Sequence, residues 1–528
     1  MSQAVAIASD KPKWEIDQKT IFVTIAVMMS TFMVVLDTSI ANVALPHIAG
    51  SFSATSDEAI WVLTSYMISE GIILPTTAWF STLMGRKTFL MTCVTVFTCA
   101  SVLCGMSQSL DMMIFARVIQ GLGGGALMPL SQSILFETYP REKHGIAMSI
   151  FGFGVVLAPV IGPTLGGWIT DNYSWHWIFF INVPVGLIAL ILSYIFLEDP
   201  DYLKKKTIEK IDYVGFSALV IWLVTMQVVL DNGQKNDWFA ASWICWTSAL
   251  SFTAMVTFFA WELKYKNSII DLSVFKDKNY AIGTTLSCLV QAILYSTLAI
   301  LPLFLQNLMG YSAYHSGMAI SPRGVATLLS IIFSGILIGK VDIRGLIIFG
   351  FIMLGTSSFM FGNSNLQMSI ANIVIPNLVC GVALGFIFIP LATVSFSTLK
   401  PAQIPNATGL QNLAKSVGGS FGTALVVTLL TRGAQTHQTF MVSHLNNFNP
   451  VFHERVQATT SSLAMHMNHI VASHKANAMI YNSLLQQANL WSYIDNFRFY
   501  GTLCFLMIPL VLFIKPPTKG SKENVSIH

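Results

Sequence analysis

The chain has 528 residues, of which 54% are hydrophobic and only 10% are charged. Soluble domains carry about 25% charged residues, so this composition excludes an ordinary soluble protein. The formal net charge of +4 is too small to favour nucleic acid as a partner. With a mean hydropathy of +0.64, the chain divides naturally into apolar segments of about 20 residues, the length that crosses a bilayer.

Fourteen apolar segments follow one another along the chain. Each can cross about 30 Å of hydrocarbon as a helix, and all are too continuous for the strands of a membrane barrel. They predict an all-α membrane protein with 14 transmembrane helices. The segments are residues 21–46, 60–84, 88–107, 112–135, 146–170, 177–197, 212–230, 241–261, 280–306, 314–339, 344–362, 370–398, 405–431 and 491–514.

The basic residues predict how these spans are oriented. With the N-terminus inside, 21 Lys and Arg residues fall in inside segments and four in outside segments. Cytoplasmic loops are enriched in basic residues, so both termini are expected in the cytoplasm. Residues 198–211 then form a basic inside linker, and residues 432–490 form a long polar outside loop that holds six of the 11 histidines. Without an acidic or Cys ligand nearby, these histidines do not favour a metal site, and no cofactor is expected.

A repeat in the apolar runs indicates two six-span halves. Pro129-Leu130 recurs as Pro390-Leu391, and at the same offset Gly124 matches Gly385. Such repeats are found in many secondary transporters. The expected organisation is a cytoplasmic N-terminus (1–20), a six-helix bundle (21–197), a basic linker with two inserted transmembrane helices (198–279), a second six-helix bundle that includes the loop 432–490 (280–514), and a cytoplasmic tail (515–528).

Three charged residues within the spans of the first half point to function, since an ionisable group in the bilayer costs about 2.5–3.5 kcal/mol on insertion scales. Asp37, Glu70 and Arg117 lie in the first, second and fourth spans and can meet in the outer half of one bundle. An acid that alternates between an arginine partner and a desolvated neutral state can carry a proton. We predict proton coupling by Asp37 and Glu70 with Arg117 as supporting charge; a purely structural ion pair is the alternative.

The second half carries the cations Arg323 and Lys415 within its spans. Each can face an anionic substrate or hydrogen-bond to backbone carbonyls between helices, and we favour the structural interpretation. Arg498 is expected to pair with Asp495 at the start of the last span. Apolar substrates suit walls that draw on 24 Met and 36 Phe residues. Polar residues on inner spans that we expect to contact a substrate are Gln120, Gln291, Tyr295 and Asn412, together with Arg323.

Glycine-rich stretches predict close packing between helices. A more specific hypothesis is that these helices slide or rock against each other during transport. Residues 335–340 are the nearest approach to a Walker A motif, but their spacing is too short, so an ion gradient is the expected energy source. No nucleophile–base pair or His/Asp cluster favours an enzyme. In the fifth span the packing residues are Gly154, Pro159, Gly162, Pro163, Gly166 and Gly167.

Several motifs resemble those of a known transporter family. Residues 36–46, LDTSIANVALP, resemble the first-span signature of the fourteen-span drug:proton antiporters of the major facilitator superfamily. Residues 117–121 resemble the fourth-span arginine motif, residues 154–167 the antiporter motif of the fifth span, and residues 175–184 the entry to the sixth. Within this family the chain looks closest to the EmrB-type multidrug exporters.

This resemblance implies a major facilitator fold, in which two six-helix bundles alternate access to a central cavity. It implies proton-driven efflux of hydrophobic drugs across a bacterial inner membrane, and hence antibiotic resistance, with Asp37 as the first-span acid and Arg117 as the fourth-span arginine. It also implies a tripartite efflux pump with a periplasmic EmrA-like adaptor and an outer-membrane TolC-like channel. A rival interpretation is export of one endogenous compound such as a siderophore or a fatty acid.

The sequence departs from the family pattern at two places. In the loop after the second span, Ala78, Thr82 and Leu83 replace the motif's first Gly, Asp and Arg, and only residues 85–87, Gly-Arg-Lys, remain. The charge network that the family builds there is therefore expected to be incomplete. His176 stands where an arginine is common in the family.

Overall fold

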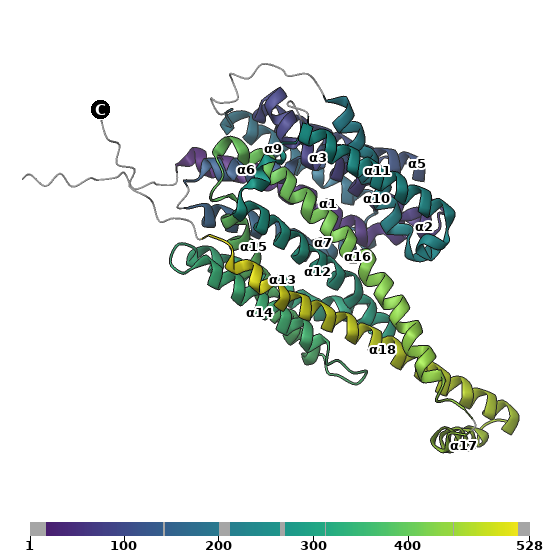
Figure 1. Cartoon of the computed structure of the whole chain (residues 1–528). Coiled ribbons are helices and arrows are strands. Elements are labelled where there is room, and N and C mark those ends of the chain that lie inside the picture. Colours follow the sequence, from purple (N-terminus) through teal and green to yellow (C-terminus); the bar gives the residue numbers. More distant parts are fainter. Residues whose placement is uncertain are drawn as a thin grey trace, which may run out of the picture.

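The computed structural model describes residues 17–140, 143–199, 212–264, 270–311, 313–446 and 448–515. Within these ranges the chain is helical and contains no β-strand (Figure 1), which confirms the predicted all-α class. Of the described helices, 13 are long and apolar enough to cross a membrane. The second predicted span is also a helix, α3 (Trp61–Met84), but it is not one of the 13 because Glu70 and several Ser and Thr residues dilute its hydropathy.

The first half of the chain forms a bundle around α1 (Gln18–Ser51). α1 packs against α6, α7 and α9, and α5 packs against both α3 and α4. The predicted fourth span is interrupted between α5 and α6, near Gly125. The remaining helices of this bundle are α2 (Ser56–Ala59), α4 (Arg86–Gly105), α5 (Leu110–Gly124), α6 (Leu127–Thr138), α7 (His144–Asn172), α8 (Trp177–Phe180) and α9 (Asn182–Phe196).

The second half forms a similar bundle, in which α12 packs against α16, and α14 and α13 both pack against α15. The counterpart of the interrupted fourth span is the continuous helix α15, which holds both Pro376 and Pro390 in its interior. The helices are α12 (Lys278–Leu303), which runs into a π-helical turn (Phe304–Leu308), α13 (Ala313–Leu337), α14 (Ile343–Phe361), α15 (Ala371–Phe396), α16 (Ile404–Val442) and α18 (His469–Leu512).

Two helices inserted between the halves, α10 (Tyr213–Asn232) and α11 (Ser242–Lys264), pack against each other. α10 also contacts both bundles: Thr64 of α3 donates to Asp231 at 3.3 Å, and Ser420 of α16 donates to Gln227 at 2.8 Å. The pair therefore lies beside the line where α3 meets α16. The predicted fold of two six-helix bundles with two inserted helices is confirmed. The predicted residue limits of these units stay a prediction.

The prediction of a loop at residues 432–490 is wrong, because most of this segment is helical. α16 continues to Val442, α17 covers Pro450–Ala464, and α18 begins at His469, so the two predicted spans are the inner parts of longer helices. Asn449 and Asn468 cap the N-termini of α17 and α18 with their side chains. Hydropathy does not reveal such helices, since they are polar. The extended ends of α16 and α18 project from the bundles together with α17 (Figure 1); we call this unit the hairpin.

The base of the hairpin corrects a second expectation. Asp495 of α18 pairs with His437 of α16 at 2.8 Å. Arg498 instead donates to the carbonyl oxygen of Gly362 at 3.0 Å. The predicted pair between Arg498 and Asp495 is therefore not the one that forms, because the extended α16 brings His437 to the carboxylate.

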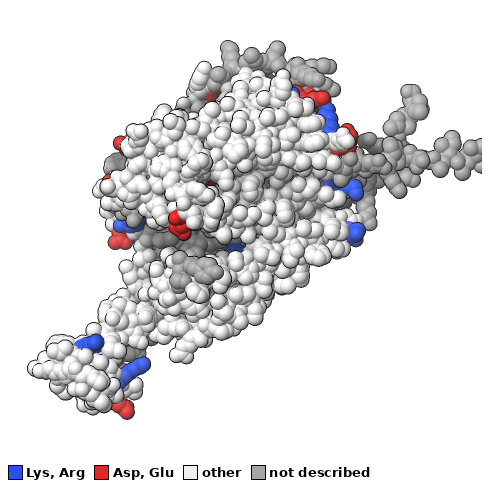
Figure 2. Space-filling view, turned by 180° about the vertical axis from the view of Figure 1, so that it is seen from behind, with Lys and Arg blue, Asp and Glu red and all other residues white. Residues whose placement is uncertain are grey.

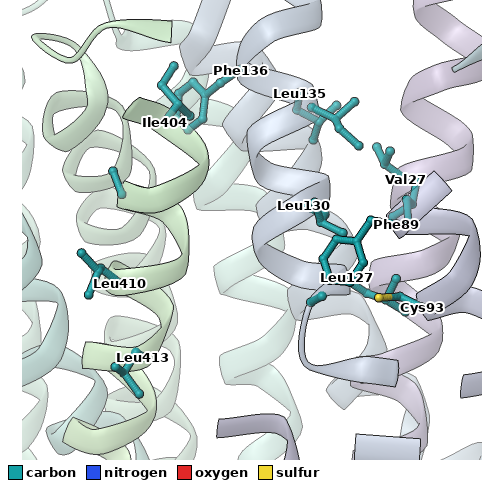
Figure 3. Close-up of a cluster of buried hydrophobic side chains, with 14 of the residues drawn as sticks. Val27, Phe89, Cys93, Leu127, Leu130, Leu135, Phe136, Ile404, Leu410 and Leu413 are labelled. Carbon is teal, nitrogen blue, oxygen red and sulfur yellow. The ribbon is translucent and has the colours of Figure 1, made fainter. Parts of the chain in front are cut away.

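The two bundles meet along a seam at the end of the molecule opposite the hairpin. The rings of Phe136 and Phe396 lie 5.0 Å apart there, and Asn412 donates to Gln132 at 3.3 Å. Buried apolar side chains of both bundles gather around this seam, with Phe136 beside Ile404 (Figure 3). On the hairpin side, the space-filling view shows a recess between the two lobes (Figure 2). The molecule is therefore closed at the seam and hollowed on the hairpin side.

Candidate functional site

The carboxylate of Asp37 is the centre of a buried polar cluster in the first bundle. Its side chain is 2% exposed. Oδ2 accepts a hydrogen bond from Arg117 Nη1 at 2.6 Å, and Oδ1 accepts from Gln120 Nε2 at 2.9 Å and Asn182 Nδ2 at 2.7 Å. All three partners donate, which is the bonding pattern of an ionised carboxylate rather than of a carboxylic acid.

Arg117 is held from several directions and has no exposed surface. Its Nε donates to the carbonyl oxygen of Val62 at 3.0 Å. The guanidinium lies over the ring of Tyr66, 4.3 Å from the ring centre, an arrangement that favours a cation. α3 therefore fixes the position of the arginine that pairs with Asp37.

Ser101 on α4 completes the cluster. Its hydroxyl oxygen accepts hydrogen bonds from Gln120 at 2.7 Å and from Asn182 at 3.2 Å. The two amides that bind Asp37 are thus oriented by the same hydroxyl. Five helices contribute to the cluster, which are α1, α3, α4, α5 and α9.

Local sequence explains why α5 reaches this position. Arg117 and Gln120 are three residues apart and share one face of the helix. Gly121 and Gly123 allow α5 to press between its neighbours, because an added Cβ would lie 2.6 Å from the Tyr66 carbonyl oxygen in α3 or 2.7 Å from the Phe97 nitrogen in α4. A side chain at either glycine would therefore displace Arg117 from Asp37.

The glycines of α7 seat that helix on α1. A Cβ added at Gly162 would lie 2.4 Å from the Ser39 hydroxyl, only two residues from Asp37 in the sequence. Gly154 and Gly166 approach α1 in the same way, whereas Gly167 faces open space and Pro159 is exposed. The side chain of Pro163 lies outside the described residues. Three of the six predicted packing residues thus set the distance between α7 and the segment that carries Asp37.

Glu70 lies near the cluster but is not part of it. Its half-buried side chain is within electrostatic range of Asp37 and Arg117, yet it forms no hydrogen bond or ion pair with a described residue. Its charge also reaches Tyr295 of the second bundle. Of the three predicted proton-coupling residues, the structure joins two and leaves the third at the interface of the bundles.

The polar residues expected to contact a substrate fall into different surroundings. Gln120 has no exposed surface and belongs to the Asp37 cluster. Asn412 is 8% exposed and bonds across the seam. Tyr295 is 41% exposed, and Gln291, one turn before it on α12, is half-buried. Of these residues, Tyr295 has the most surface available to a ligand.

The two cations of the second half have no counter-ion among the described residues. Arg323 is 5% exposed, and its Nη1 has no hydrogen-bond partner in the described part of the chain. Lys415 on α16 is half-buried, and no hydrogen bond or ion pair joins it to a described residue. Within the part of the chain that the structure describes, neither side chain is bonded to a backbone carbonyl.

The shortened motif after α3 still forms polar contacts. Arg86 makes an ion pair with Glu137 at the end of α6, and the backbone nitrogen of Lys87 donates to Asp199 at 2.8 Å. Part of a charge network is therefore present despite the lost motif residues. At the other departure, the His176 ring stacks on Trp175 at 3.7 Å, and partial burial lowers the pKa of its imidazole.

Sequence reasoning missed Asn182 and Ser101 as members of the cluster. Asn182 is the only amide in the apolar run of residues 177–197, and that isolation was a usable signal. Ser101 gives no such signal, because isolated Ser residues in apolar helices commonly bond to their own backbone. In the described residues no group of three His, Cys, Asp or Glu side chains is placed to hold a metal ion.

Comparison with known proteins decides the family. The sequence profile of the Major Facilitator Superfamily matches residues 27–423. The chain belongs to this superfamily. Its members are membrane transporters and not enzymes, which agrees with the long apolar helices described above.

Individual members of the superfamily are similar over nearly the whole chain. The multidrug export protein EmrB of Escherichia coli (strain K12) is 34% identical over 498 residues, covering 94% of this chain and 96% of that protein. The fatty acid resistance protein FarB of Neisseria gonorrhoeae is 32% identical, covering 94% and 96%. The solved structure of the proton:xylose symporter XylE superposes with a TM-score of 0.59 at 15% identity, covering 94% and 96%. The predicted resemblance and fold are confirmed.

Proposed function

We propose that this transporter is a proton-coupled antiporter that exports hydrophobic drugs and other toxic apolar compounds. The observation that carries the proposal is Asp37, an acid in the middle of a membrane helix whose two oxygens are bonded by Arg117, Gln120 and Asn182. Ionisable groups at such depth are costly and mark proton relays in transporters. Export of apolar drugs is supported by the similarity to EmrB.

Proton exchange at Asp37 requires the cluster to open. Protonation removes the negative charge of Asp37, which weakens the hydrogen bonds that it accepts, and Arg117 loses its counter-charge. α1 and α5 then shift relative to each other. Glu70 lies beside the cluster, no described residue bonds to its carboxylate, and it is the group we assign to passing the proton to or from the recess.

The seam supplies the moving part of this mechanism. α7 rests on α1 through Gly162 and also packs against α13 of the second bundle, where Ser149 donates to the Ile331 carbonyl oxygen at 3.2 Å. A shift of α1 therefore reaches the seam directly through α7. In one state of alternating access the seam is closed and the recess is open. In the other state the seam is open and the recess is closed.

We further propose a bacterial inner membrane location with both termini in the cytoplasm. The distribution of basic residues supports this orientation, and it places the hairpin on the periplasmic side. There the hairpin is available to an EmrA-like adaptor, which a TolC-like channel would complete as a tripartite pump. Loss of resistance in cells that lack the channel tests this assembly.

The experiment that tests proton coupling is substrate-induced proton release from purified protein in detergent. Wild type is expected to release protons when an apolar drug is added, and Asp37→Asn is expected to release none while remaining folded. Glu70→Gln is the matched variant, expected to slow the release without abolishing it. If Asp37→Asn releases as many protons as wild type, Asp37 is structural and the proposal fails at its central residue.

A second candidate function is export of one endogenous compound such as a fatty acid. The similarity to FarB favours it. The substrate range of a strain that lacks this transporter separates the two functions, since a multidrug exporter changes the resistance to several unrelated compounds.

A further inference from the structure

Lys415 is a charged group inside the membrane that the mechanism above does not use. It lies on α16, 11 residues after the helix begins at Ile404. Its side chain is half-buried, and no described residue bonds to it or pairs with its charge. An unpaired ammonium in a low-dielectric setting is costly, and a negative charge brought by a ligand would offset that cost.

The neighbours of Lys415 on α16 place it between the seam and Tyr295 of the second bundle. Asn412, three residues before it, bonds to Gln132 across the closed seam. Gly419, four residues after it, lies against the ring of Tyr295, where an added Cβ would be 3.4 Å from the ring. Residues three and four apart share a helix face. The ammonium therefore lies between the closed seam and the exposed ring of Tyr295.

We propose that Lys415 binds the anionic group of an amphipathic substrate, whose apolar body extends along Tyr295 into the recess. The proposal rests on the export function proposed above and narrows its substrate class to apolar monoanions such as long-chain carboxylates. One ammonium neutralises one negative charge, so a monoanionic carboxylate matches its charge better than a dianionic phosphate does. Gln291, one turn before Tyr295 on α12, is a half-buried polar group on the same face of that helix.

The first bundle strengthens the assignment of the anion to Lys415. Arg117 is sealed against Asp37 and has no exposed surface, so it cannot meet a ligand in this conformation. Glu70, whose charge lies within electrostatic range of Tyr295, would repel an anion when ionised. An anionic headgroup in the recess is thus directed to α16, away from the proton-coupling cluster.

The test is equilibrium binding of radiolabelled dodecanoate and its uncharged methyl ester to the purified full chain in one detergent. Lys415→Met removes the charge and keeps most of the side-chain volume, Lys415→Gln is a second neutral variant, and Lys415→Arg retains a cation. Lys475→Met is the matched control, because Lys475 is an exposed lysine of the hairpin. Thermal unfolding establishes that each variant is folded.

Wild type is expected to bind dodecanoate more tightly than the ester. Both neutral variants should weaken dodecanoate binding about tenfold, the usual size of one charge-assisted hydrogen bond, and leave ester binding unchanged. Lys415→Arg should recover most of the affinity, and Lys475→Met should match wild type.

Equal binding of acid and ester by wild type, binding of neither, or equal weakening of both in the neutral variants would overturn the assignment of Lys415. Such a result leaves drug-induced proton release untouched. Failure of proton release in wild type overturns the antiport proposal instead, so the two failures are distinguishable.

Discussion

In the first bundle the buried cation Arg117 lies 2.6 Å from the carboxylate of Asp37, whereas in the second bundle Arg323 and Lys415 have no carboxylate partner among the described residues. The two bundles are otherwise similar in helix arrangement. We propose that the difference reflects two roles for a charge within a membrane helix. A paired charge switches when its partner is protonated, and an unpaired charge binds the opposite charge of a ligand.

Removing the charge of Arg117 is expected to have the largest effect on stability. Arg117→Met leaves the carboxylate of Asp37 buried without a counter-charge, which should lower the free energy of unfolding by about 3 kcal/mol or more. Arg323→Met is the matched substitution in the second bundle, and it should cost much less because no ion pair is lost. Thermal unfolding of both variants in one detergent measures the difference. Equal losses would mean that Arg323 has a structural role as large as that of Arg117.

Asn182 tests whether the cluster depends on neutral donors as well as on the arginine. Asn182→Ala removes one hydrogen bond to the Asp37 carboxylate and should cost about 2 kcal/mol, the range for bonds to charged groups. Asn172→Ala is the control, since the Asn172 amide is exposed and bonds only to the backbone of its own helix. Thermal unfolding gives the comparison, and a loss no larger than that of the control would show that Arg117 alone stabilises the carboxylate.

The seam contact gives the smallest effect. Asn412→Ala removes the hydrogen bond to Gln132 between the bundles and should favour opening of the seam by about 1 kcal/mol, a shift of roughly fivefold. Distances between spin labels at the ends of α6 and α16 measure the population of the open form. Thr431→Ala, an exposed position on the same helix, is expected to change nothing. An unchanged distance distribution in Asn412→Ala would place the closing interactions elsewhere, in apolar contacts such as Phe136 with Phe396.

The candidate site was only partly predictable. Asp37 and Arg117 stand out because charged residues are rare in apolar runs, and their pairing follows from the depth that each reaches in its span. Gln120 was expected at the substrate, but it lies in the cluster, since its position three residues from Arg117 puts both side chains on the face of α5 from which they reach Asp37. The hairpin escaped prediction because its helices are polar, and hydropathy reports membrane depth rather than helicity.

Hydropathy and charge are local properties of a chain, so the sequence by itself determined the all-α membrane class and marked Asp37 and Arg117 as charged residues within the spans. Its motifs also determined the family. The tertiary structure decided which side chains complete the cluster and which cations stay unpaired. Ser101 and Asn182 come from α4 and α9, far from Asp37 in sequence, and hydrogen bonds require atoms within about 3 Å. That proximity depends on how closely glycine lets the helices pack, and the open recess beside Lys415 depends on where the two bundles do not touch.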